Sequence, residues 1–183
     1  MRLEVKELTE ANLIQAPEWG SYPFSCKYCI YWEHPELCTD PAAEAKEEGF
    51  EKKLAWLWRV RREWGGCGKL VCLDGKGVGY AQYAPARFFP GVASYPAGPV
   101  SEDAVFLACL FIPKPKHRGQ GLGSLLLRTI LDELHGRDVR AVETFARRGS
   151  PENPSGPVEL YLRNGFEIHR DHPEFPLLRL KLA

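Results

Sequence analysis

An apolar strand pattern, followed by a glycine-rich turn and an amphipathic helix, constrains the fold of this sequence most strongly. The run 104–112 is almost wholly apolar, residues 118–124 hold three glycines in five positions, and a helical apolar periodicity continues to residue 135. Backbone N–H groups at a helix start point outward and carry partial positive charge, so a phosphate can bind there. Glycines let the backbone come close to the phosphate oxygens. The layout therefore predicts an anion site at residues 118–124.

Three other interpretations of the glycine-rich segment fit less well. A nucleotide P-loop needs Lys and then Ser or Thr after its last glycine, whereas this chain has Ser124 and Leu125 there. A dinucleotide fingerprint needs G-x-G-x-x-G early in a βαβ unit, but here the glycines follow G-x-G-x-G late in the chain. A helix that merely begins with glycines leaves their cost unexplained, because glycine is a poor helix former.

Two motifs carry a resemblance to a known family. Arg118-x-x-Gly121-x-Gly123 resembles the R/Q-x-x-G-x-G/A signature of the GNAT acyl-CoA-dependent N-acetyltransferases. The segment 160–166 resembles that family's L-Y-x-x-x-G-F motif, and the order and separation of the two agree. The resemblance covers roughly residues 68–183. It implies transfer of an acetyl group from acetyl-CoA to a primary amine of a small molecule or protein, by direct attack in a ternary complex.

The order of the predicted elements agrees with the fold that this resemblance implies. We expect strands at 2–8, 69–73, 78–83, 104–112, 139–145, 166–170 and 177–182, and helices at 41–64, 121–135 and 157–164. The fold class is α/β (α+β mixed), with a mixed central sheet and helices on both faces, in a single domain spanning residues 1–183. In the implied fold, two neighbouring parallel strands, here 104–112 and 138–145, splay apart and acyl-CoA lies in the opening.

The resemblance also assigns the cofactor contacts. The candidates are Leu110, Phe111, Ile112, Arg118, Gly119, Gln120, Gly121, Leu122, Gly123, Ser124 and Asn153. Residues 118–124 would hold the CoA pyrophosphate through backbone N–H groups, with charge-assisted bonds from the Arg118 side chain. Residues 110–112 would present a strand edge to the pantetheine amides, and they also fit a plain buried strand. Pro113 departs from the pattern because it has no N–H to donate. Pro154 stands where many relatives have a cofactor-binding Asn, so its neighbour Asn153 is carried over instead.

Two residues are candidates for the chemistry. By resemblance, Tyr161 is the general acid that reprotonates the CoA thiolate, or a contact to its sulfur; packing against the sheet is the alternative. Glu143 is the first candidate for the general base, because an acid inside the apolar strand 139–145 costs desolvation energy unless it has a role or a partner. Exposure on a polar strand face is equally compatible with the pattern. Further candidates for the base are Glu102, Asp103 and His117.

The segment 16–38 is irregular in pattern and rich in cysteine and aromatic residues. Cys26, Cys29, His34 and Cys38 lie one residue short of the zinc-knuckle spacing C-x2-C-x4-H-x4-C. A structural zinc ion would keep such a segment ordered, and a redox pair is a further alternative. Buried or free thiols are the preferred interpretation, because the segment has ordinary packing and turn residues.

Aromatic residues of this segment and of the proline-rich loop 85–100 are candidates for the wall of an acceptor site. They are Trp19, Tyr22, Tyr28, Tyr31, Trp32, Phe88, Phe89 and Tyr95. An aromatic wall favours an apolar or aromatic amine over a polyamine. For most of these side chains, a satellite core beneath long loops is the preferred interpretation.

Charge and hydropathy exclude several partners. The chain has 24 basic and 24 acidic residues, so its formal net charge is zero and no broad nucleic-acid-binding surface is expected. No apolar run of about 18 residues occurs, and the first residues do not resemble a signal peptide. We therefore expect a cytoplasmic protein that binds no membrane, with homodimerisation left open. The alternative function is a non-catalytic acyl-CoA-binding or zinc-bearing interaction module on the same fold.

Overall fold

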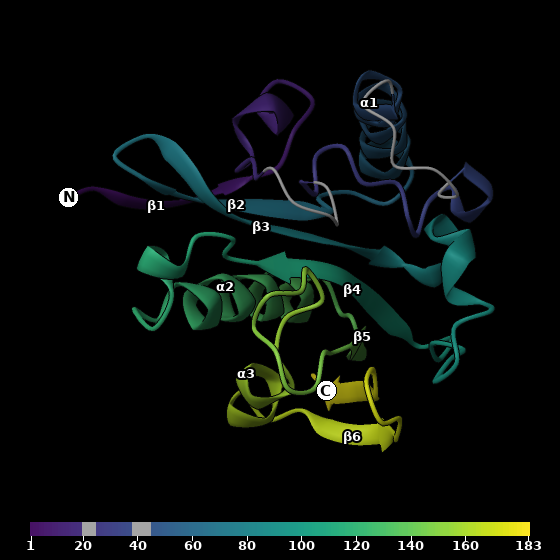
Figure 1. Cartoon of the computed structure of the whole chain (residues 1–183). Coiled ribbons are helices and arrows are strands. Elements are labelled where there is room, and N and C mark those ends of the chain that lie inside the picture. The colour runs from purple at the N-terminus through teal and green to yellow at the C-terminus, as the bar shows by residue number, and fades with distance from the viewer. Residues whose placement is uncertain (20–24, 38–44) are drawn as a thin grey trace.

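One mixed sheet dominates the protein, whose computed structural model describes residues 1–19, 25–37 and 45–183 (Figure 1). Its strands are β1 (Leu3–Glu7), β2 (Gly68–Leu73), β3 (Lys76–Pro85), β4 (Ala104–Phe111), β5 (Ala141–Phe145), β6 (Glu167–Arg170) and β7 (Leu177–Lys181). Their order in the seven-stranded sheet is β1-β2-β3-β4-β5-β7-β6. The helices are α1 (Ala45–Glu63), α2 (Leu122–Gly136) and α3 (Val158–Arg163). This confirms the expected fold class.

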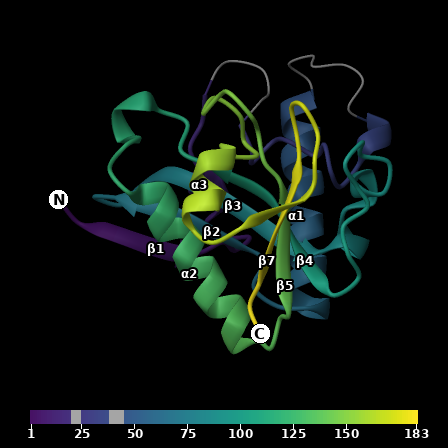
Figure 2. The ribbon, with the colours of Figure 1, turned by 90° about the horizontal axis from the view of Figure 1, so that it is seen from below.

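Helices cover both faces of the sheet. Figure 1 shows α1 above the sheet and α2 and α3 below it, and Figure 2 shows α2 and α3 from the side that they cover. Each face carries its own apolar cluster, one packed against α1 and the other against α2 and α3. All eight residues of β4 are buried, as the apolar run predicts for a central strand. No helix among the described residues has the length and apolarity that a membrane crossing requires.

Most predicted elements lie within a few residues of their expected positions. The residues 41–44, where the first helix is predicted to begin, lie outside the described part of the chain. The strand predicted from residue 139 begins at Ala141 instead. The Val139 N–H donates a hydrogen bond to the Leu134 carbonyl at 3.1 Å, so this residue closes the end of α2 rather than joining the sheet.

The parallel strands β4 and β5 part after a short contact. They pair only through Ala104–Phe106 and Ala141–Glu143. Beyond this point the Thr144 hydroxyl donates to the Leu107 carbonyl at 2.8 Å. The register of β3 against β4 then shifts so that Ala108 has no opposite residue, which is a β-bulge that bends the strand. The splayed strands that the sequence predicts are therefore present.

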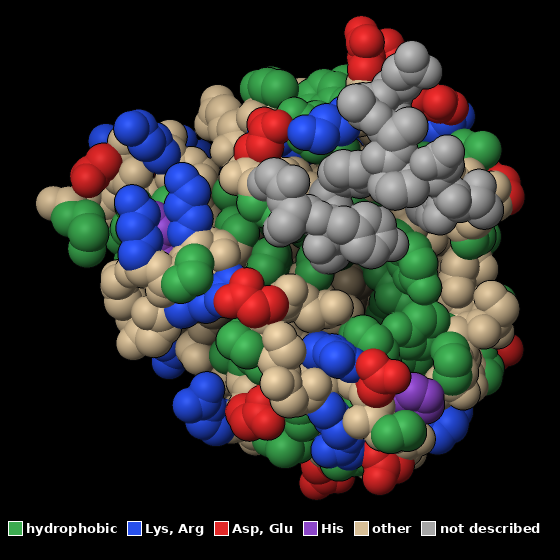
Figure 3. All heavy atoms as spheres, in the orientation of Figure 1, with side chains coloured by type: hydrophobic (Ala, Val, Ile, Leu, Met, Phe, Trp, Pro, Cys, Tyr) green, Lys and Arg blue, Asp and Glu red, His purple; other side chains and the backbone are tan. Residues whose placement is uncertain are grey.

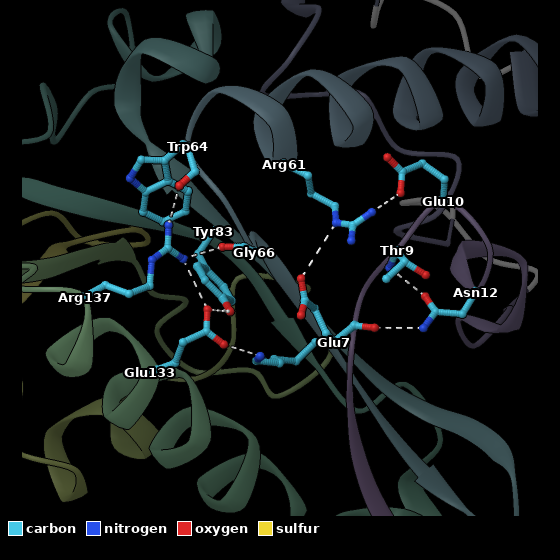
Figure 4. A network of polar contacts seen from close by, with 11 residues as sticks. Glu7, Thr9, Glu10, Asn12, Arg61, Trp64, Gly66, Tyr83, Glu133 and Arg137 are labelled. Carbon is cyan, nitrogen blue, oxygen red and sulfur yellow. Dashed lines mark hydrogen bonds and ion pairs between the residues drawn. The ribbon is translucent and has the colours of Figure 1, made fainter.

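A polar network joins the C-terminal end of α2 to the α1–β2 connection (Figure 4). Arg137 donates to the carbonyl oxygens of Gly66 at 2.7 Å and Trp64 at 2.9 Å, and its guanidinium lies 3.8 Å from the centre of a Trp64 ring. Glu133, one turn earlier on α2, contacts Arg137 and accepts a hydrogen bond from the Tyr83 hydroxyl at 3.0 Å. These contacts fix the axis of α2, and therefore the position of its N-terminus.

Candidate functional site

The start of α2 presents a set of backbone donors with no protein acceptor. Gly119 and Gly121 adopt φ values of +70° and +80°, and a Cβ atom added to either would meet nothing within 4 Å. No described residue accepts a hydrogen bond from the N–H groups of residues 119–124. Because the helix dipole adds partial positive charge at this end, these donors can bind an anion. The predicted anion site is accessible and chemically suited to a phosphate.

Arg118 makes several contacts within the protein, and its predicted contact with the CoA pyrophosphate stays a prediction. Its own N–H donates to the Pro115 carbonyl at 3.0 Å and so is not available to a ligand. Its side chain donates to the carbonyl oxygens of Ile112 at 2.7 Å and Pro113 at 2.6 Å, and pairs with the Glu152 carboxylate. The hydrogen bond from Arg118 lowers the pKa of Glu152. Arg118 therefore braces the connection between β4 and α2, and these contacts use four of the five N–H groups of its guanidinium.

Other basic side chains surround the donors of α2. Lys114 and Lys116 are exposed beside the 3-10 turn Pro115–His117, and the Gln120 side-chain amide donates to the Lys116 carbonyl at 2.7 Å. Lys and Arg side chains gather at the left of Figure 3, on the side where this connection lies in Figure 1. Their positive charge increases the local concentration of an anionic ligand.

Tyr161 lies on α3 below the opening between β4 and β5. It is fully buried, and its hydroxyl donates to the Ser155 carbonyl at 2.7 Å. Burial raises the pKa of Tyr161, so the phenol stays protonated at neutral pH. A Cβ atom on Gly156 would lie 2.8 Å from this hydroxyl and 3.1 Å from the Leu110 carbonyl, so only glycine fits there. The motif tyrosine is therefore a hydrogen-bond donor at the edge of β4.

The loop of residues 150–156 lies against the same edge. The Leu110 N–H, on the side of β4 where the strands part, donates to the Pro154 carbonyl at 2.9 Å. Neighbouring loop residues contact Arg118, through Glu152, and Tyr161, through Ser155. The Asn153 side chain accepts a hydrogen bond from the Ser155 N–H at 2.9 Å, which shapes this turn. Asn153 thus organises the 150–156 loop, and its contact with the cofactor stays a prediction.

Glu143 is enclosed by partners that suit a structural role. Its side chain is fully buried on β5, where one oxygen accepts from the Ser101 N–H at 2.8 Å and the other from Arg179 at 2.7 Å. Arg179, on the adjacent strand β7, also binds Asp103 at 2.7 Å. A buried carboxylate needs a counter-charge, and Arg179 supplies it for Glu143. These contacts give the Glu143 carboxylate a structural role, and its role as the general base stays a prediction.

Comparison with known proteins identifies the family. The model of the acetyltransferase (GNAT) family matches residues 28–166. The chain belongs to this family of acetyltransferases. No curated protein matches its sequence.

Solved structures share the fold of this acetyltransferase at low sequence identity. PaiA N-acetyltransferase from Thermoplasma acidophilum, in complex with coenzyme A, has a TM-score of 0.61 and 14% identity over 99% of both chains. The yncA protein of Salmonella typhimurium, with its cofactor acetyl-CoA, has a TM-score of 0.62 and 18% identity over 100% of this chain and 95% of that one. The ribosomal-protein-S18-alanine N-acetyltransferase of Escherichia coli has a TM-score of 0.54 and 15% identity, over 100% and 95%.

A buried polar cluster of the acetyltransferase had no signal in its sequence. The Lys53 ammonium on α1 pairs with the Glu33 carboxylate and donates to the Gln82 side chain at 2.8 Å, and the Tyr80 hydroxyl donates to Gln82 at 2.7 Å. Burial has the largest single effect and lowers the pKa of Lys53, but Glu33, Cys29 and Cys109 together raise it above its ordinary value. Since Gln82 lies opposite Cys109 in the β3–β4 pairing, the cluster joins α1 to the strand beside the opening.

The residues considered as alternative zinc ligands do not form a site in the described part of the acetyltransferase. Cys38 lies outside the described residues, and within them no group of three or more His, Cys, Asp or Glu side chains could hold a metal ion. Cys26 is buried beside Cys109, and burial raises the pKa of Cys29 to about 12. Such thiols are poor metal ligands and poor nucleophiles at neutral pH, which agrees with the preferred interpretation as buried thiols.

The predicted aromatic wall divides into core and cavity residues. Trp32, Phe88 and Phe89 are buried in the cluster that packs against α1, and Tyr22 lies outside the described residues. Tyr31 and Tyr95 line a cavity of about 400 Å³. Figure 3 shows hydrophobic side chains gathered around a hollowed surface on the right-hand side of this face.

Proposed function

We propose that this acetyltransferase uses acetyl-CoA to acetylate a primary amine of a small molecule or a protein, by direct attack in a ternary complex. The observation that carries the proposal is the set of N–H groups at residues 119–124, which find no acceptor among the described residues and lie at the open start of α2. A coenzyme diphosphate is the anion that such a cradle suits in this family. The relatives from T. acidophilum and S. typhimurium, solved with coenzyme A and acetyl-CoA, support this choice.

The remaining contacts suit the acyl end of the same molecule. The acceptor nitrogen attacks the thioester carbonyl carbon, the carbon–sulfur bond breaks, the amine loses a proton to water, and the thiolate gains one. The Leu110 N–H faces the opening and would polarise the thioester oxygen once the Pro154 carbonyl moves away. Because burial raises the pKa of Tyr161, its hydroxyl is better suited to donate a hydrogen bond to the departing sulfur than to give up its proton fully.

A substitution in the cradle tests the proposal. Gly121→Glu places a carboxylate and a side chain at a positive-φ position in the cradle, so we expect at least about a 100-fold loss of acetyl-CoA affinity by calorimetry, roughly 3 kcal/mol. Gly75→Glu is the matched control: Gly75 has a φ of +79° and equally open surroundings, but lies in the β2–β3 turn. Equal affinities for the two variants would contradict the proposal.

A non-catalytic acyl-CoA-binding module is the second candidate. It is favoured by the hydrogen bonds that occupy Leu110 and Tyr161, since both groups must be released before they can act on a thioester. The two functions differ in one measurement. An acetyltransferase releases CoA when acetyl-CoA is mixed with an amine panel, whereas the module is stabilised by acetyl-CoA against heat without turnover of any amine.

A further inference from the structure

The cavity beside Tyr31 lies on the face of the sheet opposite to the anion cradle. Three segments far apart in the sequence form its wall: Tyr31 and Pro35, Tyr95 and Pro96, and His172 and Phe175. The first precedes α1, the second lies in the proline-rich loop, and the third joins β6 to β7. A cavity of about 400 Å³ built from three such segments is within the size range of small-molecule sites.

Ring contacts connect this cavity to the opening between β4 and β5. The Tyr95 ring lies 4.5 Å from that of Phe145, the last residue of β5. The preceding residue, Thr144, bonds across the opening to Leu107. Tyr95 and Phe145 pack in the cluster on the α1 side, whereas Tyr161 packs in the cluster on the α2 side. Two reactants held by the cradle and the cavity would therefore meet at the opening from opposite faces.

The lining of the cavity defines the chemistry that it accepts. Its described wall contains aromatic rings, prolines and hydroxyl groups but no acidic, lysine or arginine side chain. Burial raises the pKa of Tyr95 to about 12, so its hydroxyl stays neutral. The nearby Glu174 carboxylate is paired with Arg147 at 2.7 Å, and the Arg147 guanidinium lies 5.0 Å from the centre of the Phe175 ring. A polycationic ligand would lose hydration there without gaining a counter-charge, whereas an aromatic ring would gain stacking partners.

We infer that this cavity holds the aromatic group of the acceptor, and that the preferred acceptor is a primary amine that carries an aromatic ring. This inference rests on the proposed function and adds the class of its substrate. The same chemistry occurs in a free arylalkylamine and in a peptide whose first residue is phenylalanine. In both, the ring fills the cavity and the amine points toward the opening.

An amine panel tests the inference with acetyl-CoA as donor. We expect kcat/KM for 2-phenylethylamine or for a peptide beginning with Phe to exceed that for n-butylamine and spermidine by at least about tenfold. Whichever aromatic amine reacts faster identifies the source of the acceptor. A preference for spermidine would overturn the inference. Calorimetry with acetyl-CoA alone, run in parallel, reports on the proposed function separately.

Two tyrosine variants test whether the preference for aromatic amines depends on this cavity. Tyr31→Ala removes a half-exposed wall of the cavity, so KM for the preferred aromatic amine should rise about tenfold while KM for n-butylamine and acetyl-CoA affinity stay unchanged. Tyr28→Ala is the control, because Tyr28 packs on Phe50 and does not line the cavity. An equal loss for all amines in Tyr31→Ala would overturn the inference. If no amine turns over, calorimetry of 2-phenylethylamine on the CoA-saturated protein decides, and binding insensitive to Tyr31→Ala would also overturn it.

Discussion

At the residue scale, the groups of the candidate site differ in whether a partner within the protein already occupies them. The motif glycines leave donors open, as expected, but the Arg118 guanidinium binds backbone carbonyls and Glu152. Tyr161 is in place and fully buried, yet its hydroxyl is already bonded. A motif predicts residue type and spacing. The partner that each side chain finds depends on which loop lies against it, and that information is not local in the sequence.

Tyr161→Phe separates the chemical role of the hydroxyl from its structural one. We expect kcat to fall about 10- to 100-fold with little change in acetyl-CoA affinity, because the donor to the leaving sulfur is lost. Loss of the bond to the Ser155 carbonyl should also lower the free energy of unfolding by about 1–3 kcal/mol. Tyr83→Phe is the control, since it removes a similar hydroxyl that is bonded to Glu133 far from the opening. Steady-state kinetics and urea unfolding measure both effects, and normal turnover in Tyr161→Phe would rule out the role.

Arg179→Met tests whether the ion pair between Glu143 and Arg179 stabilises the fold. Removing the arginine leaves a buried carboxylate without its counter-charge, so the free energy of unfolding at pH 7 should fall by about 3–5 kcal/mol. An unpaired buried carboxylate has a raised pKa, so in the variant it takes up a proton as the pH falls and the penalty shrinks toward pH 4. In the wild type, the hydrogen bond from Arg179 lowers the pKa of Asp103. The Asp103–Arg179 pair therefore stabilises the fold at every pH above the ordinary pKa of aspartate. This stabilisation is lost only when the pH falls further, through the lowered pKa of Asp103.

Urea unfolding of wild type and Arg179→Met at pH 7 and pH 4.5 measures this difference. Glu143→Gln combined with Arg179→Met should recover part of the loss at pH 7, because the unpaired charge is gone. A difference in stability that grows as the pH falls would contradict the account.

At the scale of elements, the 150–156 loop occupies hydrogen-bonding groups beside β4, whereas the start of α2 leaves its own donors open. The loop contacts Arg118, Leu110 and Tyr161 through three of its residues, while the donors at 119–124 remain open. The helix geometry that opens these donors is set at its other end, where Arg137 and Glu133 tie α2 to the α1–β2 connection (Figure 4). A ligand that spans both regions can bind the open donors of residues 119–124 directly. It must displace the 150–156 loop to reach the Leu110 N–H and the Tyr161 hydroxyl.

Glu152→Ala should loosen this loop. The ion pair with Arg118 is partly exposed, so its loss should change the free energy of unfolding by less than about 1 kcal/mol. Because the Arg118 N–H groups that bind Glu152 can then bind a phosphate, acetyl-CoA affinity should rise about two- to fivefold by calorimetry. Asp171→Ala, which removes the exposed pair with Arg148, is the control and should leave the affinity unchanged. Weaker binding in Glu152→Ala would mean that the loop position seen here is the one that binds.

For the whole molecule, periodicity and turn chemistry were sufficient to place the sheet and its helices. The Asp74-Gly75 turn joins β2 to β3, the apolar run becomes the central strand, and Gly121 begins α2. These features are encoded within short windows of sequence. The pairs Glu143–Arg179 and Glu33–Lys53 and the contact of Pro154 with Leu110 join residues 36, 20 and 44 positions apart. No local sequence pattern predicts such partners, so the ion pairs and hydrogen bonds of the site could be identified only from the folded structure.

The closed contact between Leu110 and Pro154 has an energetic consequence. A thioester oxygen that takes the Leu110 N–H from the Pro154 carbonyl exchanges one hydrogen bond for another, so this half of the coenzyme adds little net affinity. Most of the affinity for the coenzyme then comes from its nucleotide half. The acyl half is held only weakly beside β4, and it can take its reactive position after the amine has bound.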